Sequence, residues 1–138
     1  MISDVILENS INTAQASSSV YKELESLKER LIKKDTLVVN IVTDWCSDCT
    51  VRQKPNLPSF VKQLQEHKID LIELTVQTQK GVYLSSAHQK ITEEFGGHGF
   101  PRTVLIIGGE TADSDNVEVL TAQELEQLAI RFVSKIKG

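Results

Sequence analysis

Trp45-Cys46-Ser47-Asp48-Cys49 is the stretch of this sequence that decides its fold, and it holds both of the chain's cysteines. It follows an apolar run at residues 37–42 and precedes a segment that we expect to be helical. A Cys-x-x-Cys pair where a strand passes into a helix is a redox arrangement. The N-terminus of a helix carries partial positive charge and free N–H groups, which favour a thiolate over a thiol. The second cysteine lies about one helical turn after the first, so the pair can close a small disulfide and carry two electrons.

The composition predicts one globular domain. The chain has 138 residues, 40% of them hydrophobic, so we expect residues 1–138 to form a single domain in which residues 1–35 contribute a strand and a helix. The net charge of −4 argues against nucleic acid or a membrane surface as the main partner, because either would select a basic patch. No apolar run approaches the roughly 20 residues of a membrane-spanning helix.

The first residues show no basic segment followed by a long apolar one, so we expect no signal peptide and a cytoplasmic location. In that compartment, two cysteines at this spacing are catalytic or metal-binding more often than structural. Two cysteines fill only half of a tetrahedral zinc site, so a metal would have to be shared between two chains. The three histidines show no ligand spacing to the pair, and we expect neither a metal nor another bound cofactor.

The order of the apolar patterns predicts strands that alternate with helices. We expect strands at residues 4–7, 36–43, 69–76, 102–107 and 117–120. We expect one helix at residues 18–34 and a second from Cys46 to about His67, interrupted at Pro55 and Pro58. A third helix should run from Ser85 or Ser86 to Gly96, and a fourth should follow a capping box at Thr121–Glu124. Ser17 to Ser19 are candidate caps of the first helix, and residues 108–115 are expected to form a polar turn. This order predicts an α/β fold with a central mixed sheet flanked by helices.

Two separated features of the sequence resemble the thioredoxin family. One is Trp45-Cys46-Ser47-Asp48-Cys49 after the central strand, and the other is Gly99-Phe100-Pro101 before a buried strand and hairpin. The element order over residues 36–138 is also similar, so the resemblance covers most of the chain. It implies a thioredoxin-like fold, a cis peptide bond before the proline, and a thiol–disulfide oxidoreductase that needs no bound cofactor.

The resemblance also implies roles for individual side chains. Cys46 would be the more exposed thiol and the nucleophile, and Cys49 would attack the mixed disulfide to release the substrate. Trp45 would flank the reactive sulfur as an apolar contact surface. Gly99 and Phe100 would line the groove into which the cis-proline presents a backbone edge to a bound peptide.

Several positions depart from the family pattern. Ser47 and Asp48 replace Gly-Pro between the cysteines, and Asp48 either complements the helix dipole or relays a proton to Cys49. Asn40 stands six residues before the first cysteine, where the family typically buries an aspartate that helps to move the proton of the resolving thiol. Glu73 stands where a lysine is common, so we hypothesise that a carboxylate has moved across the site and that Glu73 accepts this proton.

Arg102 follows the expected cis-proline, at a position where a threonine is usual. We interpret it as a further residue of the substrate groove. The sequence leaves open whether it contacts an acidic partner or pairs with Asp44 or Asp48.

We therefore predict a cytoplasmic thiol–disulfide oxidoreductase that reduces a disulfide in a protein or a small molecule through a mixed disulfide at Cys46. Its electrons would come from a separate reductase or from glutathione. One alternative is a redox sensor or non-catalytic binding module on the same scaffold, which fits Asn40, Arg102 and the long connection at residues 77–86. The other is a metal or cluster shared between two chains through their Cys-x-x-Cys pairs.

Overall fold

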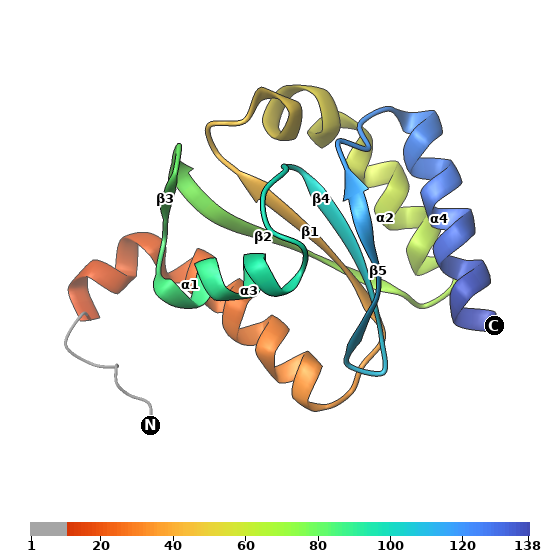
Figure 1. The fold of residues 1–138 in the computed structure, drawn as a ribbon, viewed down its shortest axis with the longest axis horizontal. Coiled ribbons are helices and arrows are strands. Elements are labelled where there is room, and N and C mark those ends of the chain that lie inside the picture. The colour runs from red at the N-terminus through yellow and green to blue at the C-terminus, as the bar shows by residue number, and fades with distance from the viewer. Residues whose placement is uncertain (1–10) are drawn as a thin grey trace.

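A five-stranded mixed sheet lies between two pairs of helices (Figure 1). The computed structural model describes residues 11–138, with side chains from Tyr21 onward. The elements are α1 (Ile11–Ile32), β1 (Leu37–Thr43), the π-helical segment η1 (Asp48–Gln53), the 3₁₀ turn η2 (Lys54–Asn56), α2 (Leu57–Gln65), β2 (Asp70–Gln79), β3 (Val82–Tyr83), α3 (Ser86–Glu94), β4 (Arg102–Ile107), β5 (Glu110–Val117) and α4 (Ala122–Lys137). None of these helices combines the length and the hydropathy that a membrane crossing requires.

The sheet has the order β3-β2-β1-β4-β5, with β1 parallel to β2 and antiparallel to β4. It confirms the predicted α/β class with a mixed sheet between helices. The strands expected at residues 36–43, 69–76 and 102–107 are present as β1, β2 and β4. The strand expected at residues 4–7 lies outside the described residues.

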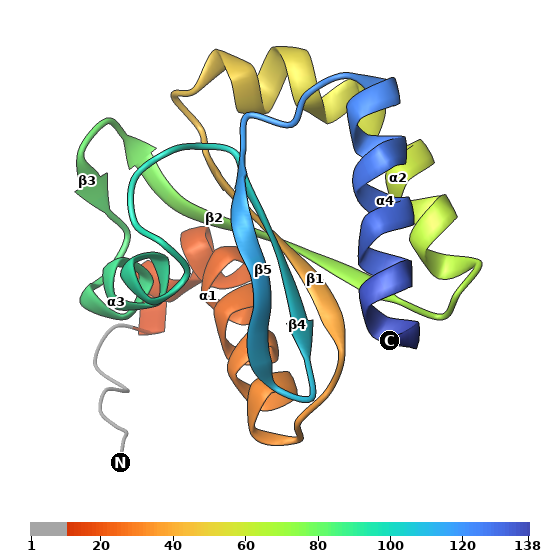
Figure 2. The same ribbon diagram turned by 45° about the vertical axis from the view of Figure 1, so that its right-hand side comes forward.

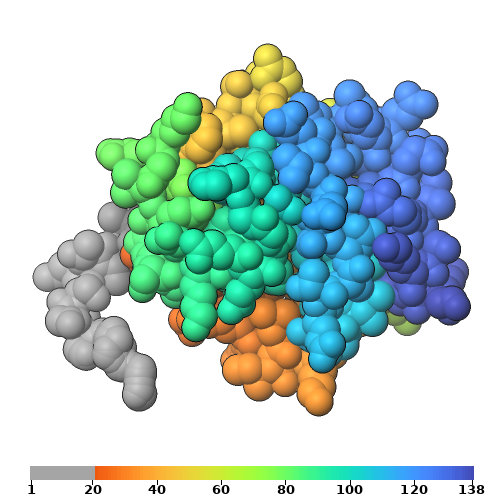
Figure 3. Space-filling view, viewed as in Figure 1, coloured from red at the N-terminus to blue at the C-terminus, as the bar shows by residue number. Residues whose placement is uncertain are grey.

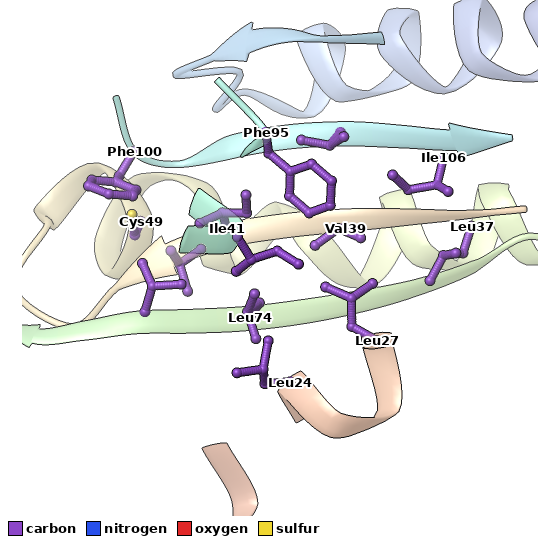
Figure 4. Packing of buried hydrophobic residues seen from close by; sticks show 14 of the residues in the cluster. Leu24, Leu27, Leu37, Val39, Ile41, Cys49, Leu74, Phe95, Phe100 and Ile106 are labelled. Carbon is purple, nitrogen blue, oxygen red and sulfur yellow. The ribbon is translucent and has the colours of Figure 1, made fainter. Parts of the chain in front are cut away.

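Each face of the sheet is covered by one helix pair, and each pair encloses its own apolar core (Figure 2). α2 and α4 cover one face, where Phe60 and Phe132 are buried against Val38. α1 and α3 cover the other, where Leu27 and Phe95 pack against the strands (Figure 4). Because both faces are covered, β1 is buried along its whole length, which explains its nearly continuous apolar sequence.

Side-chain caps begin two of the three helices whose starts the sequence analysis placed at serine or threonine residues. The hydroxyl of Ser85 accepts a hydrogen bond from the N–H of His88 and caps α3. Thr121 and Glu124 form the expected capping box of α4. The cap predicted for α1 is wrong, because this helix begins before the serines at 17–19, which therefore lie inside it. Serine is tolerated in a helix interior, so a run of serines alone does not locate a helix start.

The helix expected after the cysteines is interrupted at Pro55 and Pro58, as the sequence analysis predicts. Pro55 stands at the start of η2, and Pro58 at the start of α2. A proline lacks the N–H that would continue the preceding helix, so each proline begins a new segment instead.

The C-terminal hairpin is tighter than predicted. Gly108 and Gly109 have φ angles of 61° and 84° and form the turn by themselves, because glycine adopts positive φ without strain. β5 therefore starts at Glu110, so the expected polar turn over residues 108–115 and the strand at 117–120 are both wrong. The prediction failed because β5 is an edge strand with polar, largely solvent-facing side chains, and it has no apolar run.

An additional strand pair lies beside the cysteines. β2 continues to Gln79, and the chain turns at Gly81 (φ 82°) into β3, which pairs back on β2. Figures 1 and 2 show this β2–β3 hairpin (residues 77–83) standing out at the end of the sheet where β1 leads into η1. Much of the long connection expected at residues 77–86 is therefore an ordered hairpin.

Burial of His88 predicts that stability depends on pH. Its ring is buried, Nδ1 lies 2.7 Å from the Ser85 hydroxyl, and Nε2 has no partner among the described residues. Burial, reinforced by the positive charge of Lys28, lowers the pKa of His88 from 6.5 to about 4. The unfolded chain takes up this proton at a higher pH than the folded chain. Stability from the neutral ring is therefore complete above pH 6.5 and is lost as the pH falls toward 4.

We expect this one group to lower the free energy of unfolding by up to about 3 kcal/mol as the pH falls through that range. Urea unfolding of the wild-type protein and of His88→Gln, measured across the same pH range, isolates the contribution. The variant should lose this part of the pH dependence, and identical profiles for the two proteins would contradict the assignment.

Candidate active site

Cys46 presents its thiol to a cavity. The side chain is 9% exposed and lines a cavity of about 490 Å³ at the end of the sheet where β1 leads into η1. Its sulfur lies 3.6 Å from the carbonyl oxygen of Phe100, which accepts from the thiol. The backbone N–H of Cys49 donates to the same sulfur across 3.4 Å. Both cysteines are free thiols, and Cys46 is the one that a substrate in the cavity can reach.

Cys49 lies in the apolar core between the sheet and the α1–α3 pair (Figure 4). It is 3% exposed and does not line the cavity. Burial raises the pKa of the Cys49 thiol to about 12; the Cys46 sulfur adds to this increase, and Thr43 opposes it. Cys49 is therefore a neutral, enclosed thiol at neutral pH.

The backbone of η1 fixes this arrangement. The carbonyl oxygen of Cys46 accepts hydrogen bonds from the N–H of Cys49 at 3.1 Å, the N–H of Thr50 at 3.0 Å and the Thr50 hydroxyl at 3.1 Å. The following residues wind as a π-helix, a rare form that occurs frequently at functional sites. The turn places the second cysteine beneath the first, toward the core.

Trp45 flanks the cavity as the resemblance implied, and it is 38% exposed. Its Nε1 donates to Oε1 of Gln77 at 2.9 Å. Its ring meets Phe100 edge-on, with 6.2 Å between centroids, and Nζ of Lys80 lies 5.5 Å from the ring centroid. The indole therefore joins the cysteine loop, the proline loop and the β2–β3 hairpin.

Asp48 is paired within its own helical segment. Its carboxylate lies 2.8 Å from Nη1 of Arg52, one turn further on, and the same nitrogen donates to the Ser47 hydroxyl at 3.1 Å. Ser47 and Asp48 both line the cavity. These contacts agree with an aspartate that stabilises the start of a helix. A proton relay from Asp48 to Cys49 stays a prediction.

The loop before β4 forms a wall of the cavity beside Trp45. The Phe100–Pro101 peptide bond is cis, the isomer that the resemblance implied. Gly99 has a φ of 108°, and a Cβ at this position would lie 2.9 Å from Cγ1 of Val117, so only glycine fits. Gly99 and Phe100 line the cavity as predicted.

Arg102 does not line the cavity, so its predicted place in the substrate groove is wrong. Its side chain is buried, and the guanidinium donates to the carbonyl oxygens of His98 at 2.8 Å and Ser114 at 2.7 Å. It therefore pairs with neither Asp44 nor Asp48. A buried guanidinium needs oxygen acceptors, and Nη1 and Nη2 find them in the edge strand and the proline loop, which the side chain ties together; Nε has no partner among the described residues.

Asn40 belongs to a neutral hydrogen-bond network. Its Nδ2 donates to Oε1 of Gln53 at 2.8 Å, and its Oδ1 accepts from the Thr103 hydroxyl at 2.9 Å. Gln53 in turn donates to the carbonyl oxygen of Val119 at 2.9 Å. All of these side chains are uncharged, and no carboxylate is among the buried polar residues of the described chain. The position at which the resemblance implied a titrating aspartate therefore holds an amide with satisfied hydrogen bonds.

Glu73 is the register partner of Asn40 on β2, as the hypothesis of a moved carboxylate requires. Its charge acts on Glu23 of α1, whose pKa is raised by burial and, to a smaller extent, by Glu73. The groups that shift the pKa of Cys49 do not include Glu73. Its role as a proton acceptor stays a prediction.

Five residues that line the cavity were not named by the sequence analysis: Gln77, Lys80, Gly81, His98 and Glu118. Lys80 precedes Gly81, and a glycine indicates a turn, but nothing in the sequence places that turn beside Cys46. Gln77 carried no signal, because an amide in a strand has no pattern that separates a site residue from a surface residue. Glu118 follows β5, whose boundaries were misplaced.

The structure matches solved thioredoxins. The oxidised thioredoxin of Plasmodium falciparum aligns with a TM-score of 0.58 and 16% identity, over 78% of this chain and 90% of that chain. Fasciola hepatica thioredoxin aligns with a TM-score of 0.55 and 18% identity, over 79% and 90%. Mitochondrial thioredoxin 3 of Saccharomyces cerevisiae aligns with a TM-score of 0.54 and 17% identity, over 78% and 89%.

These likenesses confirm the fold expected from the sequence: the chain has the thioredoxin fold. No family model and no curated protein sequence matches the chain. At such identities the shared fold does not by itself establish an activity, which has to be argued from the site. Among the described residues, no group of three or more His, Cys, Asp and Glu side chains is placed to hold a metal ion.

The buried contacts of Arg102 predict a large loss of stability on substitution. Arg102→Gln should lower the free energy of unfolding by about 2–4 kcal/mol, because a buried charged donor and its hydrogen bonds to two carbonyl oxygens are lost. Arg52→Gln removes the same charge from an exposed pair and should cost less than about 1 kcal/mol. Urea unfolding of both variants measures the two free energies of unfolding. A similarly small decrease in both would show that the buried contacts of Arg102 do not stabilise the fold.

Proposed function

We propose that the chain is a thiol–disulfide oxidoreductase that reduces disulfides of proteins or small molecules through the Cys46–Cys49 couple. The observation that carries the proposal is the asymmetry of the two thiols. Cys46 lines a cavity beside Trp45 and the carbonyl oxygen of Phe100, whereas Cys49 is enclosed directly behind it. One thiol is therefore placed to meet a substrate and the other only to meet its neighbour.

The reaction uses two exchanges. The Cys46 thiolate attacks one sulfur of the substrate disulfide; a bond forms between the two sulfurs, the substrate S–S bond breaks, and the leaving thiolate takes up a proton. Cys49 then loses its proton and attacks the sulfur of Cys46, which releases the second substrate thiol and leaves a Cys46–Cys49 disulfide. The substrate has gained two electrons and the protein has lost them.

A second thiol system has to return the electrons. We propose glutathione or a separate reductase as the donor, and a cytoplasmic setting in which such donors keep dithiols reduced. No bound cofactor takes part, because both electrons reside in the two sulfurs. We further propose that residues 1–138 act as one domain.

The neutral surroundings of Cys49 favour a second candidate, a redox sensor. Burial raises the pKa of this thiol to about 12, and the groups that shift this pKa include no carboxylate. The hydrogen-bond network of Asn40 is also uncharged. Slow attack by Cys49 would prolong the mixed disulfide at Cys46. A domain that captures a partner in this way would respond to oxidation rather than turn over quickly.

The two cysteines should fail in different ways when each is replaced by serine. Cys46→Ser should abolish reduction of a small disulfide, because the accessible nucleophile is lost. Cys49→Ser should retain the first step and accumulate one mixed disulfide per chain, visible as a mass increase that disappears after reduction. Adduct formation in Cys46→Ser but not in Cys49→Ser would overturn the assignment of roles.

The rate of release separates the two candidates. In the wild-type protein, rapid disappearance of the mixed disulfide supports the oxidoreductase. A mixed disulfide that persists for minutes while Cys49 remains a thiol supports the sensor.

A further inference from the structure

The tip of the β2–β3 hairpin places a positive charge at the rim of the cavity. Nζ of Lys80 lies 5.5 Å from the centroid of the Trp45 ring, within the range of a cation–π contact. Both residues line the cavity that contains Cys46. Figure 3 shows the hairpin, in green, beside the gold segment that leads into η1. A cation therefore lies close to the path of a substrate disulfide toward Cys46.

Gln77 fixes the hairpin in this position. Its buried Oε1 accepts hydrogen bonds from Nε1 of Trp45 at 2.9 Å and from the N–H of Gly81 at 3.0 Å. Its carbonyl oxygen accepts from the N–H of Asp44 at 2.9 Å. The residues next to Cys46 and the turn that carries Lys80 are thus joined through one side chain, so the ammonium group stands on an ordered support.

The other charges at the cavity leave Lys80 available to a ligand. Asp48 is already paired with Arg52. Glu118 and His98 adjoin β5 and β4, which lie across β1 from the hairpin in the order of the sheet. None of the ion pairs found between side chains of the described residues uses Lys80. An anionic group on the hairpin side of the cavity therefore meets a cation, whereas the other side presents a carboxylate.

We propose that Lys80 is a specificity-determining residue that selects disulfides bearing a carboxylate a few atoms from the sulfur. This inference rests on the proposed function, because it assigns a substrate class to the same cavity. The redox step is the exchange given above, with Cys46 attacking a sulfur of the anionic disulfide. The net charge of −4 on the whole chain repels anions in general, so a preference for them has to come from a local group.

A matched series of small disulfides tests the proposal. In 3,3′-dithiodipropionate, bis(2-hydroxyethyl) disulfide and cystamine, the sulfur is followed by the same two carbons and then by an anionic, a neutral or a cationic group. The reduced protein is mixed with each probe, and free thiols are counted after acid quenching to give a second-order rate constant. Wild-type protein is compared with Lys80→Gln and with Lys62→Gln, which removes the same charge from the exposed surface of α2.

We expect Lys80→Gln to lower the rate with the dianionic probe about two- to fivefold more than the rate with the neutral probe, because Lys80 is exposed at the rim and water screens its contact with the carboxylate. The rate with cystamine should rise relative to the neutral probe. Lys62→Gln should leave the three relative rates unchanged. A Lys80→Gln variant whose three rates change by the same factor, or do not change, would falsify the inference. Failure of the wild-type protein to react with the neutral probe would instead defeat the proposed function itself.

Two further probes identify the source of the carboxylate. Glutathione disulfide and a disulfide-bonded peptide with a glutamate next to its cysteine share the chemistry that Lys80 recognises. If Lys80→Gln lowers the rate constant more with glutathione disulfide, the site is assigned to a small molecule. If it lowers the rate constant more with the peptide, the site is assigned to an acidic protein segment. Equal rates of wild-type and Lys80→Gln protein with both probes would contradict the proposal.

Discussion

The enclosure of Cys49 behind Cys46 is the constraint on which the rest of the site depends. β1 is buried along its whole length and ends just before the cysteines. The chain therefore leaves the sheet inside the apolar core, to which both sulfurs belong. The enclosure also requires the carbonyl of Cys46 to hold the turn by three hydrogen bonds. The proline loop and the β2–β3 hairpin then close two sides of a cavity that only the first sulfur lines.

The same enclosure sets the chemical difficulty of the site. A thiol buried in an apolar core holds its proton, and no carboxylate is among the groups that shift the pKa of Cys49. The network of Asn40, Gln53 and Thr103 is likewise uncharged. The first exchange and the second exchange are thus governed by different surroundings. In the proposed reaction, the cavity would decide which disulfide is attacked, and the core would decide how soon the resulting mixed disulfide is resolved.

The sequence predicted those elements whose burial or capping leaves a pattern. β4 was located to the residue, and the capping box of α4 was found because backbone chemistry requires specific side chains there. The start of α3 was predicted at Ser85 or Ser86, and Ser85 is its cap. β5 was misplaced because an edge strand needs no apolar run. Arg102 was misassigned because the sequence shows a charge beside a loop, whereas its direction depends on carbonyl groups brought together only by the fold. Gln77 was missed for the same reason.

The most direct test of the account is equilibration of the protein with buffers of defined thiol–disulfide ratio, followed by trapping of free thiols and measurement of mass. We predict that Cys46 and Cys49 interconvert reversibly between a dithiol and an intramolecular disulfide in a single two-electron transition, with a midpoint near the roughly −270 mV of thioredoxin. A midpoint above about −200 mV would contradict a reductant. The absence of any intramolecular disulfide would contradict the oxidoreductase itself.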